Sequence, residues 1–206
     1  NLVTNGDLET WTNATTPTSW DKAENITQES TTIHGDTYSA KQQAGTKDLQ
    51  QNVSGLSAGT EYTISYWYLD NDANAKSRLW AYWLNGTSTV SDNSTELRPS
   101  TYSSDNASWQ EYTVTITAPA TVNGLRFEVR SYNDNAGSGF IYFDDFSVNA
   151  SADGDPPTFT STYPKGQSTT ASGFDVAVSL DEIGSAYFVV IADGATAPSS
   201  AQVKAG

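Results

Sequence analysis

Residues 61–69 read Glu-Tyr-Thr-Ile-Ser-Tyr-Trp-Tyr-Leu. Every second side chain from Tyr62 to Tyr68 is apolar or aromatic, whereas the positions between them hold two small polar residues and Trp67. Side chains of an extended chain alternate between two faces, so this stretch predicts a strand with one buried and one exposed face. If the richer apolar set is the buried one, Trp67 points outward.

The same alternation recurs on both sides of this stretch. Gly, Asn, Asp and Pro interrupt the chain at short intervals, and no segment repeats apolar residues with the period of a helix. The sequence therefore predicts an all-β protein. Further strands are expected at residues 2–8, 37–43, 77–84, 109–118, 124–132 and 140–148.

A domain boundary is expected near residue 150. The segment after it lacks alternation and ends in Pro156 and Pro157, which hold the chain extended and remove backbone donors. The expected organisation is a first domain at residues 1–150, a Pro-rich linker at 151–157 and a second β domain at 158–206.

The second domain is short for a β-sandwich with its own core. Its three expected strands are residues 158–163, 174–180 and 186–191. Because these are too few to close a sandwich, we expect a partial domain and a larger protein that continues beyond Gly206.

The composition excludes several kinds of partner. The 206 residues carry a formal net charge of −14 and no segment dense in lysine or arginine, so neither nucleic acid nor an anionic membrane surface is expected. There is no cysteine, hence no disulfide or thiolate metal site, and no apolar run long enough to span a bilayer. The chain begins with Asn rather than Met, which fits removal of a signal peptide and fits an artificially chosen start equally well. We expect a secreted protein, extracellular or held at a cell surface.

Aromatic and charged residues share one expected solvent side. Around Arg78, alternation places the arginine on the wet side, and Leu79, Ala81 and Trp83 inward. In residues 124–132 the expected inward set is Leu125, Phe127 and Val129. The predicted binding residues on the outer side are Trp67, Arg78, Trp80, Tyr82, Arg126, Glu128, Arg130 and Tyr132.

A surface of this kind suits a polysaccharide. The apolar C–H faces of sugar rings stack on aromatic rings, and sugar hydroxyls bond to arginine and glutamate. Neighbouring strands lie about 4.8 Å apart, close to the length of one sugar residue, so adjacent strands can contact successive rings. Arginines on an acidic chain also suggest a glycan with sulfate or uronate groups, since guanidinium binds such oxyanions in a bidentate manner.

Carboxylates occur inside apolar strand patterns at both ends of the first domain. Asp7 and Glu9 follow the first apolar residues, and Asp144 and Asp145 interrupt the run at 140–148. Unpaired charge is costly in such a position, and a cation such as calcium would neutralise it. The sequence therefore predicts a structural calcium.

Several motifs mark a known type of module. They are Leu2-Val-Thr-Asn-Gly-Asp-Leu-Glu9, Trp11, Pro17-Thr-Ser-Trp20, His34-Gly35, Ala40-Lys41, Tyr62-Thr-Ile-Ser-Tyr66, Trp109, Tyr112-Thr-Val-Thr115 and Asp144-Asp-Phe-Ser-Val148. Together they resemble carbohydrate-binding modules of the family 4, 9 and 22 type over residues 1 to about 150. The resemblance implies a β-jelly roll that binds polysaccharide without catalysis and is joined to a secreted polysaccharide-degrading enzyme.

The resemblance also implies where the calcium binds. Such modules tie their first strand to their last through this ion, and the matching ligands are the backbone of Asp7, the side chain of Glu9, a carbonyl at His34 or Gly35, and Asp144. The second domain resembles the start of an immunoglobulin-like or fibronectin-like spacer.

Two other functions, catalysis and a structural or adhesive role, are alternatives to sugar binding. An enzyme is disfavoured because the Glu-x-Asp-x-x-Glu strand motif of jelly-roll glucanases is absent, and a Ser-His-Asp triad would depend on the single histidine, His34. A surface adhesin or structural spacer is the main alternative. It predicts that Trp67, Trp80 and Tyr82 are buried or scattered instead of sharing one surface.

Overall fold

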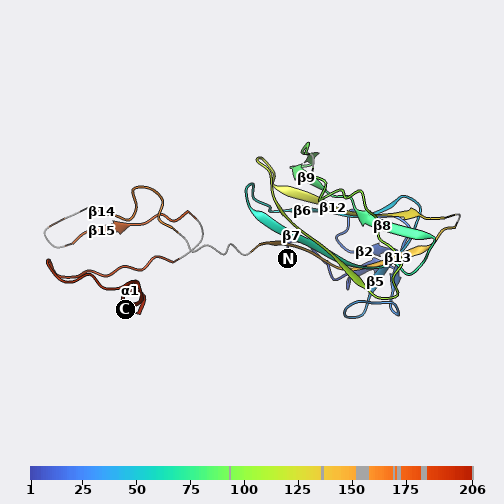
Figure 1. Ribbon diagram of the computed structural model, residues 1–206, viewed down its shortest axis with the longest axis horizontal. Helices are drawn as coiled ribbons and strands as arrows, with labels where there is room; N and C mark the ends of the chain where they lie inside the picture. Colours follow the sequence, from blue (N-terminus) through green and yellow to red (C-terminus); the bar gives the residue numbers. More distant parts are fainter. Residues whose placement is uncertain are drawn as a thin grey trace. The chain divides into compact units, whose positions relative to one another are not determined.

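The computed structural model describes residues 1–92, 94–135, 137–151, 158–168, 170, 173–181 and 185–205. The chain divides into two compact units, Asn1–Ser151 and Ala152–Gly206 (Figure 1). Apart from Ser151, the predicted linker at 151–157 lies outside the described residues.

The first unit contains two antiparallel sheets. In the first sheet, β12 (Gly124–Asn133) is central and pairs on one side with β6 (Lys47–Ser54), which in turn pairs with β3 (Lys22–Ala23). On its other side β12 pairs with two short strands that follow one another, β8 (Ala75–Leu79) and β9 (Tyr82–Asn85). A further short strand, β10 (Ser88–Thr89), pairs with β9.

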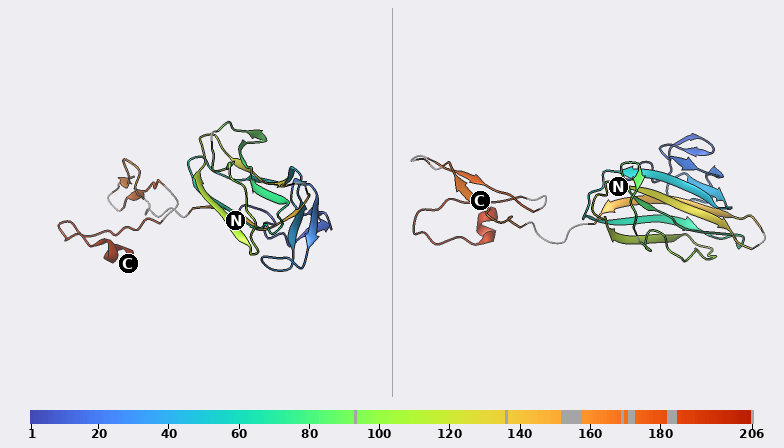
Figure 2. Two further views of the ribbon diagram at one scale, coloured as in Figure 1. Left: turned by 45° about the vertical axis from the view of Figure 1, so that its right-hand side comes forward. Right: turned by 90° about the horizontal axis from the view of Figure 1, so that it is seen from above.

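The second sheet has five strands. Their order is β11 (Gln110–Thr117), β7 (Glu61–Leu69), β13 (Phe140–Ala150), β5 (Ser39–Gln43) and β4 (Ile26–Glu29). Figure 1 shows β6, β12 and β8 in one layer and β7, β13 and β5 in the other. The small hairpin of β1 (Trp11–Asn13) and β2 (Thr16–Pro17), blue in Figure 2, lies at one end of the unit. The predicted all-β fold is confirmed.

The hydrophobic core lies between the two sheets. Leu79, Ala81, Trp83, Leu125, Phe127 and Val129, all predicted to point inward, have no exposed surface. From the second sheet, Tyr62, Ile64 and Tyr66 enter the same core, as their alternation predicted. Phe146 lies at the centre, with its ring centroid 5.3 Å from that of Phe127 and 5.6 Å from that of Tyr66. Because the core side chains occupy the inner face of each sheet, the outer faces can carry polar, charged and exposed aromatic residues.

Two strand predictions for the first unit need correction, and one long strand was missed. Residues 2–8 form turns instead of a strand, and Asn5 and Leu8 both have a φ of 53°. The segment 77–84 is interrupted between β8 and β9. The strand β6 was not expected, because its polar residues hide the alternation of Leu49 and Val53.

The two ends of the first unit meet. The backbone N–H of Leu2 donates to the carbonyl of Val148 at 2.8 Å, and the Asn1 side-chain amide donates to the carbonyl of Phe146 at 2.9 Å. The buried Gln51 holds the same segment, since its amide group both donates to and accepts from the backbone of Thr4. Hydrogen bonds from these residues thus replace the expected first strand.

The second unit has little regular structure in the described residues. A short sheet pairs β14 (Lys165–Gln167) with β15 (Asp175–Ala177), and Phe159 bridges to Leu180. A helix, α1 (Ser200–Ala205), was not predicted, and the strand predicted at 186–191 is wrong, because these residues are exposed and unpaired in any sheet. An immunoglobulin-like or fibronectin-like fold for this unit stays a prediction.

No helix in the described part of the chain is long and apolar enough to cross a membrane.

Candidate functional site

Seven of the eight side chains predicted as a binding surface lie together on the outer side of the first sheet. The strand register places Arg78 opposite Arg130, and Tyr82 opposite Arg126. All but Glu128 are partly exposed. We call this surface the Trp80 face, and it consists of Arg78, Trp80, Tyr82, Arg126, Glu128, Arg130 and Tyr132.

The break between β8 and β9 shapes this face. The backbone N–H of Trp80 still donates to the carbonyl of Glu128 at 2.8 Å, but the next N–H, of Ala81, donates to the carbonyl of Leu97 at 2.9 Å. At the other end of the same loop, the Ser103 N–H donates to the Ser77 carbonyl at 2.8 Å. We call residues 97–103 the edge loop, because it follows the outer edge of the first sheet.

The edge loop adds aromatic and cationic groups that the sequence did not predict. The Arg78 guanidinium carbon lies 4.2 Å from the ring centroid of Trp80, 4.5 Å from that of Tyr102 and 5.3 Å from that of Tyr132. Arg78 also donates to the carbonyl of Pro99 at 3.0 Å. In the same way, the Arg98 guanidinium lies 4.6 Å from the Tyr82 ring. These cation–π contacts hold the rings in fixed orientations.

A buried ionic network lies beside Trp80. Asp48, which projects from β6, accepts from Arg130 Nε at 2.5 Å and from Lys22 Nζ at 2.6 Å. Arg130 also donates to Glu128 at 2.6 Å. The side chains of Asp48 and Glu128 are only 9% and 3% exposed, so these charges are satisfied mainly by one another.

The pKa values of the two carboxyl groups are shifted in opposite directions. Desolvation, together with the charge of Asp48, raises the pKa of Glu128 to about 7. Burial also disfavours the charged form of Asp48, but hydrogen bonds from Arg130 and Lys22 outweigh it and lower the pKa of Asp48. Glu128 therefore changes charge near neutral pH, whereas Asp48 stays ionised.

Arg126 differs from the other three arginines of the chain. Arg78 is enclosed by rings, Arg98 pairs with Asp92, and Arg130 belongs to the buried network. Within the described residues, the Arg126 side chain has no ion pair, hydrogen bond or aromatic contact, and its Nε is buried without a partner. The Arg126 guanidinium is thus available to contact a ligand.

Trp67 was wrongly grouped with this set. It does point outward, but β7 belongs to the second sheet, so Trp67 lies on the opposite side of the sandwich from Trp80. Its ring stacks on His34 with centroids 3.9 Å apart, and Trp109 lies 5.6 Å from the same imidazole. Alternation along one strand gives the direction of a side chain but not the sheet to which the strand belongs.

The residues predicted to bind calcium gather around one loop. The fully buried Asp144 accepts hydrogen bonds from the backbone N–H groups of His34, at 3.1 Å, and Gly35, at 3.4 Å. Glu9 accepts from the backbone N–H groups of Thr37 and Tyr38, at 2.9 and 2.7 Å. Both carboxylates therefore bind the segment 34–38. The side chain of Asp7 is exposed.

Ionisation of the buried Asp144 carboxyl group is disfavoured. Desolvation and the neighbouring charge of Asp145 raise the pKa of Asp144 to about 7. The second carboxylate, Asp145, lies 2.6 Å from His34 Nδ1. In the described ranges, no group of three His, Asp or Glu side chains is close enough to hold a metal ion by itself. A cation here would therefore need backbone carbonyls, the kind of ligand that the resemblance implies for Asp7, His34 and Gly35.

Comparison with known proteins identifies the fold through structure alone. No protein-family model matches the sequence, and no curated protein matches it. Among solved structures, the enzymatically active domain of tailspike protein 4 of bacteriophage CBA120 is similar at a TM-score of 0.53 and 12% identity. That match covers 73% of this chain but only 21% of the tailspike chain.

Two smaller proteins are similar over almost their whole length. A family 16 carbohydrate-binding module has a TM-score of 0.50 and 18% identity, over 72% of this chain and 99% of that chain. TmCBM61, in complex with β-1,4-galactotriose, has a TM-score of 0.50 and 15% identity, over 73% of this chain and 99% of that chain. The jelly-roll β-sandwich predicted by resemblance is confirmed, and the chain has the fold of carbohydrate-binding modules.

Proposed function

We propose that the first unit binds a polysaccharide along the Trp80 face and does not cleave it. The observation that carries this proposal is the joint placement of Trp80, Tyr82 and Arg126, all partly exposed, on one sheet face. Arg78 stacks on Trp80, and Arg98 stacks on Tyr82. Two structures with the same fold are named as carbohydrate-binding modules, and one of them contains an oligosaccharide, which supports the proposal.

The geometry of the face suits an extended chain of sugars. Trp80 and Tyr82 are two positions apart in sequence, Trp80 directly after β8 and Tyr82 at the start of β9, and both belong to the Trp80 face. Tyr132 and Tyr102 continue the aromatic surface beyond Arg78, with their ring centroids 5.2 Å apart. Each ring can take the C–H face of a sugar, while arginine and carboxylate groups bond to hydroxyls.

The free guanidinium of Arg126 favours a glycan that carries oxyanions. A carboxylate or sulfate could accept two parallel hydrogen bonds from the terminal nitrogens of this group. The net charge of −14 repels a polyanion as a whole, so we expect occasional acidic groups on the bound glycan instead of one on every sugar.

Affinity electrophoresis of the full chain in gels that contain plant and algal polysaccharides tests the proposal. We expect at least one glycan to retard the protein and Trp80→Ala to abolish the retardation. Trp67→Ala is the matched control, because it removes the same side chain from the opposite sheet. Absence of retardation with every glycan would favour the adhesin or spacer function. Release of reducing sugar from the panel would indicate an enzyme.

We also propose that a calcium ion stabilises the first unit. Asp144, Glu9 and the carbonyls of Asp7, His34 and Gly35 would hold it, since calcium binds carboxylate and carbonyl oxygens together. The buried Asp144 carboxyl supports a cation, because its ionised form lacks a positive partner in the described residues. Bound calcium would supply that charge and join the segment 34–38 to the last strand.

The proposed ligand indicates where the protein acts. Structural polysaccharides occur outside cells, so we propose that the protein is extracellular or held at a cell surface. The second unit would connect the binding unit to a catalytic or surface domain.

A further inference from the structure

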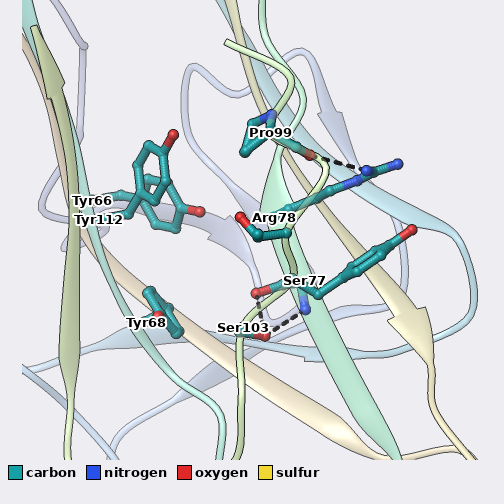
Figure 3. Close-up of a pocket in the computed structure, with 9 residues that line it drawn as sticks. Tyr66, Tyr68, Ser77, Arg78, Pro99, Ser103 and Tyr112 are labelled. Atoms are coloured by element: carbon teal, nitrogen blue, oxygen red, sulfur yellow. Dashed lines mark hydrogen bonds between the residues drawn. The ribbon is translucent and has the colours of Figure 1, made fainter. Parts of the chain in front are cut away.

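A cavity lies inside the first unit, beside the edge loop. Its volume is about 150 Å³, and it opens between the two sheets. Figure 3 shows the rings of Tyr66, Tyr68 and Tyr112 on one side of this cavity, and Ser77, Pro99 and Ser103 on the other. The tyrosines come from the second sheet, and the opposite wall comes from β8 and the edge loop, so this cavity differs from the outward Trp80 face.

The two walls have different chemistry. The ring of Tyr66 is stacked between those of Tyr112 and Phe146, with centroids 5.4 and 5.6 Å away, so this wall consists of closely packed tyrosines. Opposite it, the Ser103 hydroxyl accepts from the backbone N–H of Ser77 at 2.7 Å and donates to Asp70 at 2.6 Å. The second wall is therefore rich in hydroxyl groups that are fixed in place.

Three polar atoms of residues next to those that line the cavity lack partners in the described part of the chain. They are Asp70 Oδ1, Gln110 Oε1 and Ser131 Oγ, all buried. Asp70 bonds to the lining residue Ser103, Gln110 pairs in register with Tyr68, and Ser131 pairs in register with Ser77. Buried polar atoms in proteins are almost always bonded to protein or to an ordered molecule. A fourth such atom, Arg78 Nε, belongs to a residue that lines the cavity, and this supports a polar occupant.

The volume limits the size of this occupant. A water molecule takes about 30 Å³ in the liquid, so about five waters would fit, and a cavity of roughly 150 Å³ can hold one six-membered ring. A wall of tyrosine rings opposite a wall of hydroxyl groups matches a small molecule with apolar C–H groups and several hydroxyls. We propose that this cavity is a binding site for one small polyhydroxylated molecule of the size of a single sugar ring.

This site does not depend on the proposed function of the Trp80 face. A single sugar could enter as a free molecule or as the end of a glycan chain, and both present the same hydroxyls. The Arg78 side chain lies between the two surfaces, because it lines the cavity and stacks on Trp80. The experiment must therefore detect ligand binding in the cavity separately from ligand binding on the Trp80 face.

Nuclear magnetic resonance of the full chain, labelled with ¹⁵N, provides that separation. The protein is titrated with xylose, galactose, glucose, glucuronic acid and glycerol, one at a time. We expect at least one of them to shift the backbone amide signals of Ser77 and Ser103 in a saturable manner, while the indole N–H signal of Trp80 stays in place. An oligosaccharide of the same sugar then distinguishes the sources: a chain end that enters the cavity shifts both sets of signals.

Ser77→Val tests whether the cavity is the site. Valine fits a strand and fills part of the cavity while removing one hydroxyl, so we expect at least tenfold weaker binding of the single sugar without loss of folding. Ser65→Val on the outer side of β7 is the matched control and should leave binding unchanged. Tyr68→Phe removes a hydroxyl from the cavity with almost no change in shape, and is expected to weaken binding as well.

Two results would overturn the proposal. One is the absence of saturable shifts at Ser77 and Ser103 with all five compounds, together with magnetisation transfer from water to these amides, which would mean that water fills the cavity. The other is sugar binding that survives Ser77→Val and Tyr68→Phe unchanged, which would place the site elsewhere. Neither result affects retardation of the protein by a polysaccharide, so failure here is distinct from failure of the proposed function.

Discussion

The outer face of the second sheet carries Trp67, but its strands β7, β11 and β13 also form a surface whose chemistry differs from that of the Trp80 face. On the second sheet, short hydroxyl side chains bond across strands: Thr63 lies 3.2 Å from Thr115, and Ser65 lies 3.0 Å from Ser147. We call this the threonine face; it consists of Thr63, Ser65, Thr113, Thr115 and Ser147. The Trp80 face carries large rings, guanidinium groups and buried carboxylates instead.

The difference between the threonine face and the Trp80 face indicates which of the two surfaces is suited to binding a ligand. Short hydroxyl groups on a strand satisfy one another and water at little cost, and they offer no ring for a ligand to stack on. Buried charges such as Glu128 and Asp48 are costly to maintain, and they remain stable only because Arg130 and Lys22 compensate them. Trp80 and Arg126 are partly exposed and lie outside the hydrophobic core, which agrees with the binding role proposed for the Trp80 face.

The largest expected effect comes from breaking the ionic network. Asp48→Ala leaves the partly buried Arg130 and Lys22 without their shared carboxylate, and we expect it to lower the free energy of unfolding by about 3 kcal/mol. Urea denaturation followed by tryptophan fluorescence measures this, since all six tryptophans lie in the first unit. Thr115→Ala on the threonine face should cost less than about 0.5 kcal/mol. Equal losses for both variants would show that the faces do not differ in stability.

Removal of calcium should have the next largest effect. If the ion is present at 100 times its dissociation constant, chelation lowers the free energy of unfolding by about 2.7 kcal/mol, because the ion binds only the folded chain. Scanning calorimetry with and without EDTA measures the change. Asp144→Asn should remove most of the response to EDTA. A melting temperature that does not respond to EDTA in the unmodified protein would refute the calcium site.

Glu128 should make stability depend on pH. Its pKa of about 7 in the folded protein exceeds its ordinary value of 4.5, so the folded state holds an extra proton between these two values. Stability from this group is fully present below pH 4.5, decreases as the pH rises to about 7, and is then constant. We expect the decrease to be about 2 kcal/mol, less than the whole shift implies, because Glu128 titrates together with its neighbours.

Glu128→Gln isolates this contribution. Glutamine can still accept a hydrogen bond from Arg130 but does not titrate, so the curve of unfolding free energy against pH should become flatter between pH 4.5 and 7. Comparison of the two curves cancels the contributions of other carboxyl groups. Identical slopes for the variant and the unmodified protein would contradict the raised pKa.

The smallest expected effect concerns the charge of the ligand. Arg126→Gln should weaken the binding of a carboxylated or sulfated glycan about tenfold, which is about 1.4 kcal/mol, because a bidentate contact is lost. Binding of the neutral form of the same glycan should change less than twofold. Calorimetric titration of both forms measures this, with Lys41→Gln as a control that removes a positive charge from the second sheet. Equal weakening for both forms would mean that Arg126 binds hydroxyls only.

Local patterns in the sequence predicted much of the fold. The strand at 61–69 and the inward direction of Leu79, Trp83 and Phe127 follow from alternation, which depends only on neighbouring residues. The missed strand β6 shows the limit of this approach, because Gln51 is buried there and polar. It is buried to bind the N-terminal segment, a contact between residues far apart in the sequence.

The candidate site was predicted in part for the same reason. Arg78, Trp80 and Tyr82 lie on one short segment, and their common direction could be derived from it. Trp67 was misplaced because the pairing of β7 with β11 and β13 decides its sheet, and that pairing is not local. Asp48 and Tyr102 were missed because they reach the face from β6 and the edge loop, and only the folded chain brings these segments together.

The edge loop has a consequence for how the protein behaves at high concentration. A sheet that ends in an open strand offers unpaired N–H and C=O groups to other molecules and can extend into aggregates. Here the backbones of Leu97 and Ser103 already bond to Ala81 and Ser77 at the margin of the first sheet. Another strand therefore cannot pair with this edge of the first sheet. The aromatic residues of the Trp80 face beside it can then be exposed to solvent without promoting the formation of intermolecular sheets.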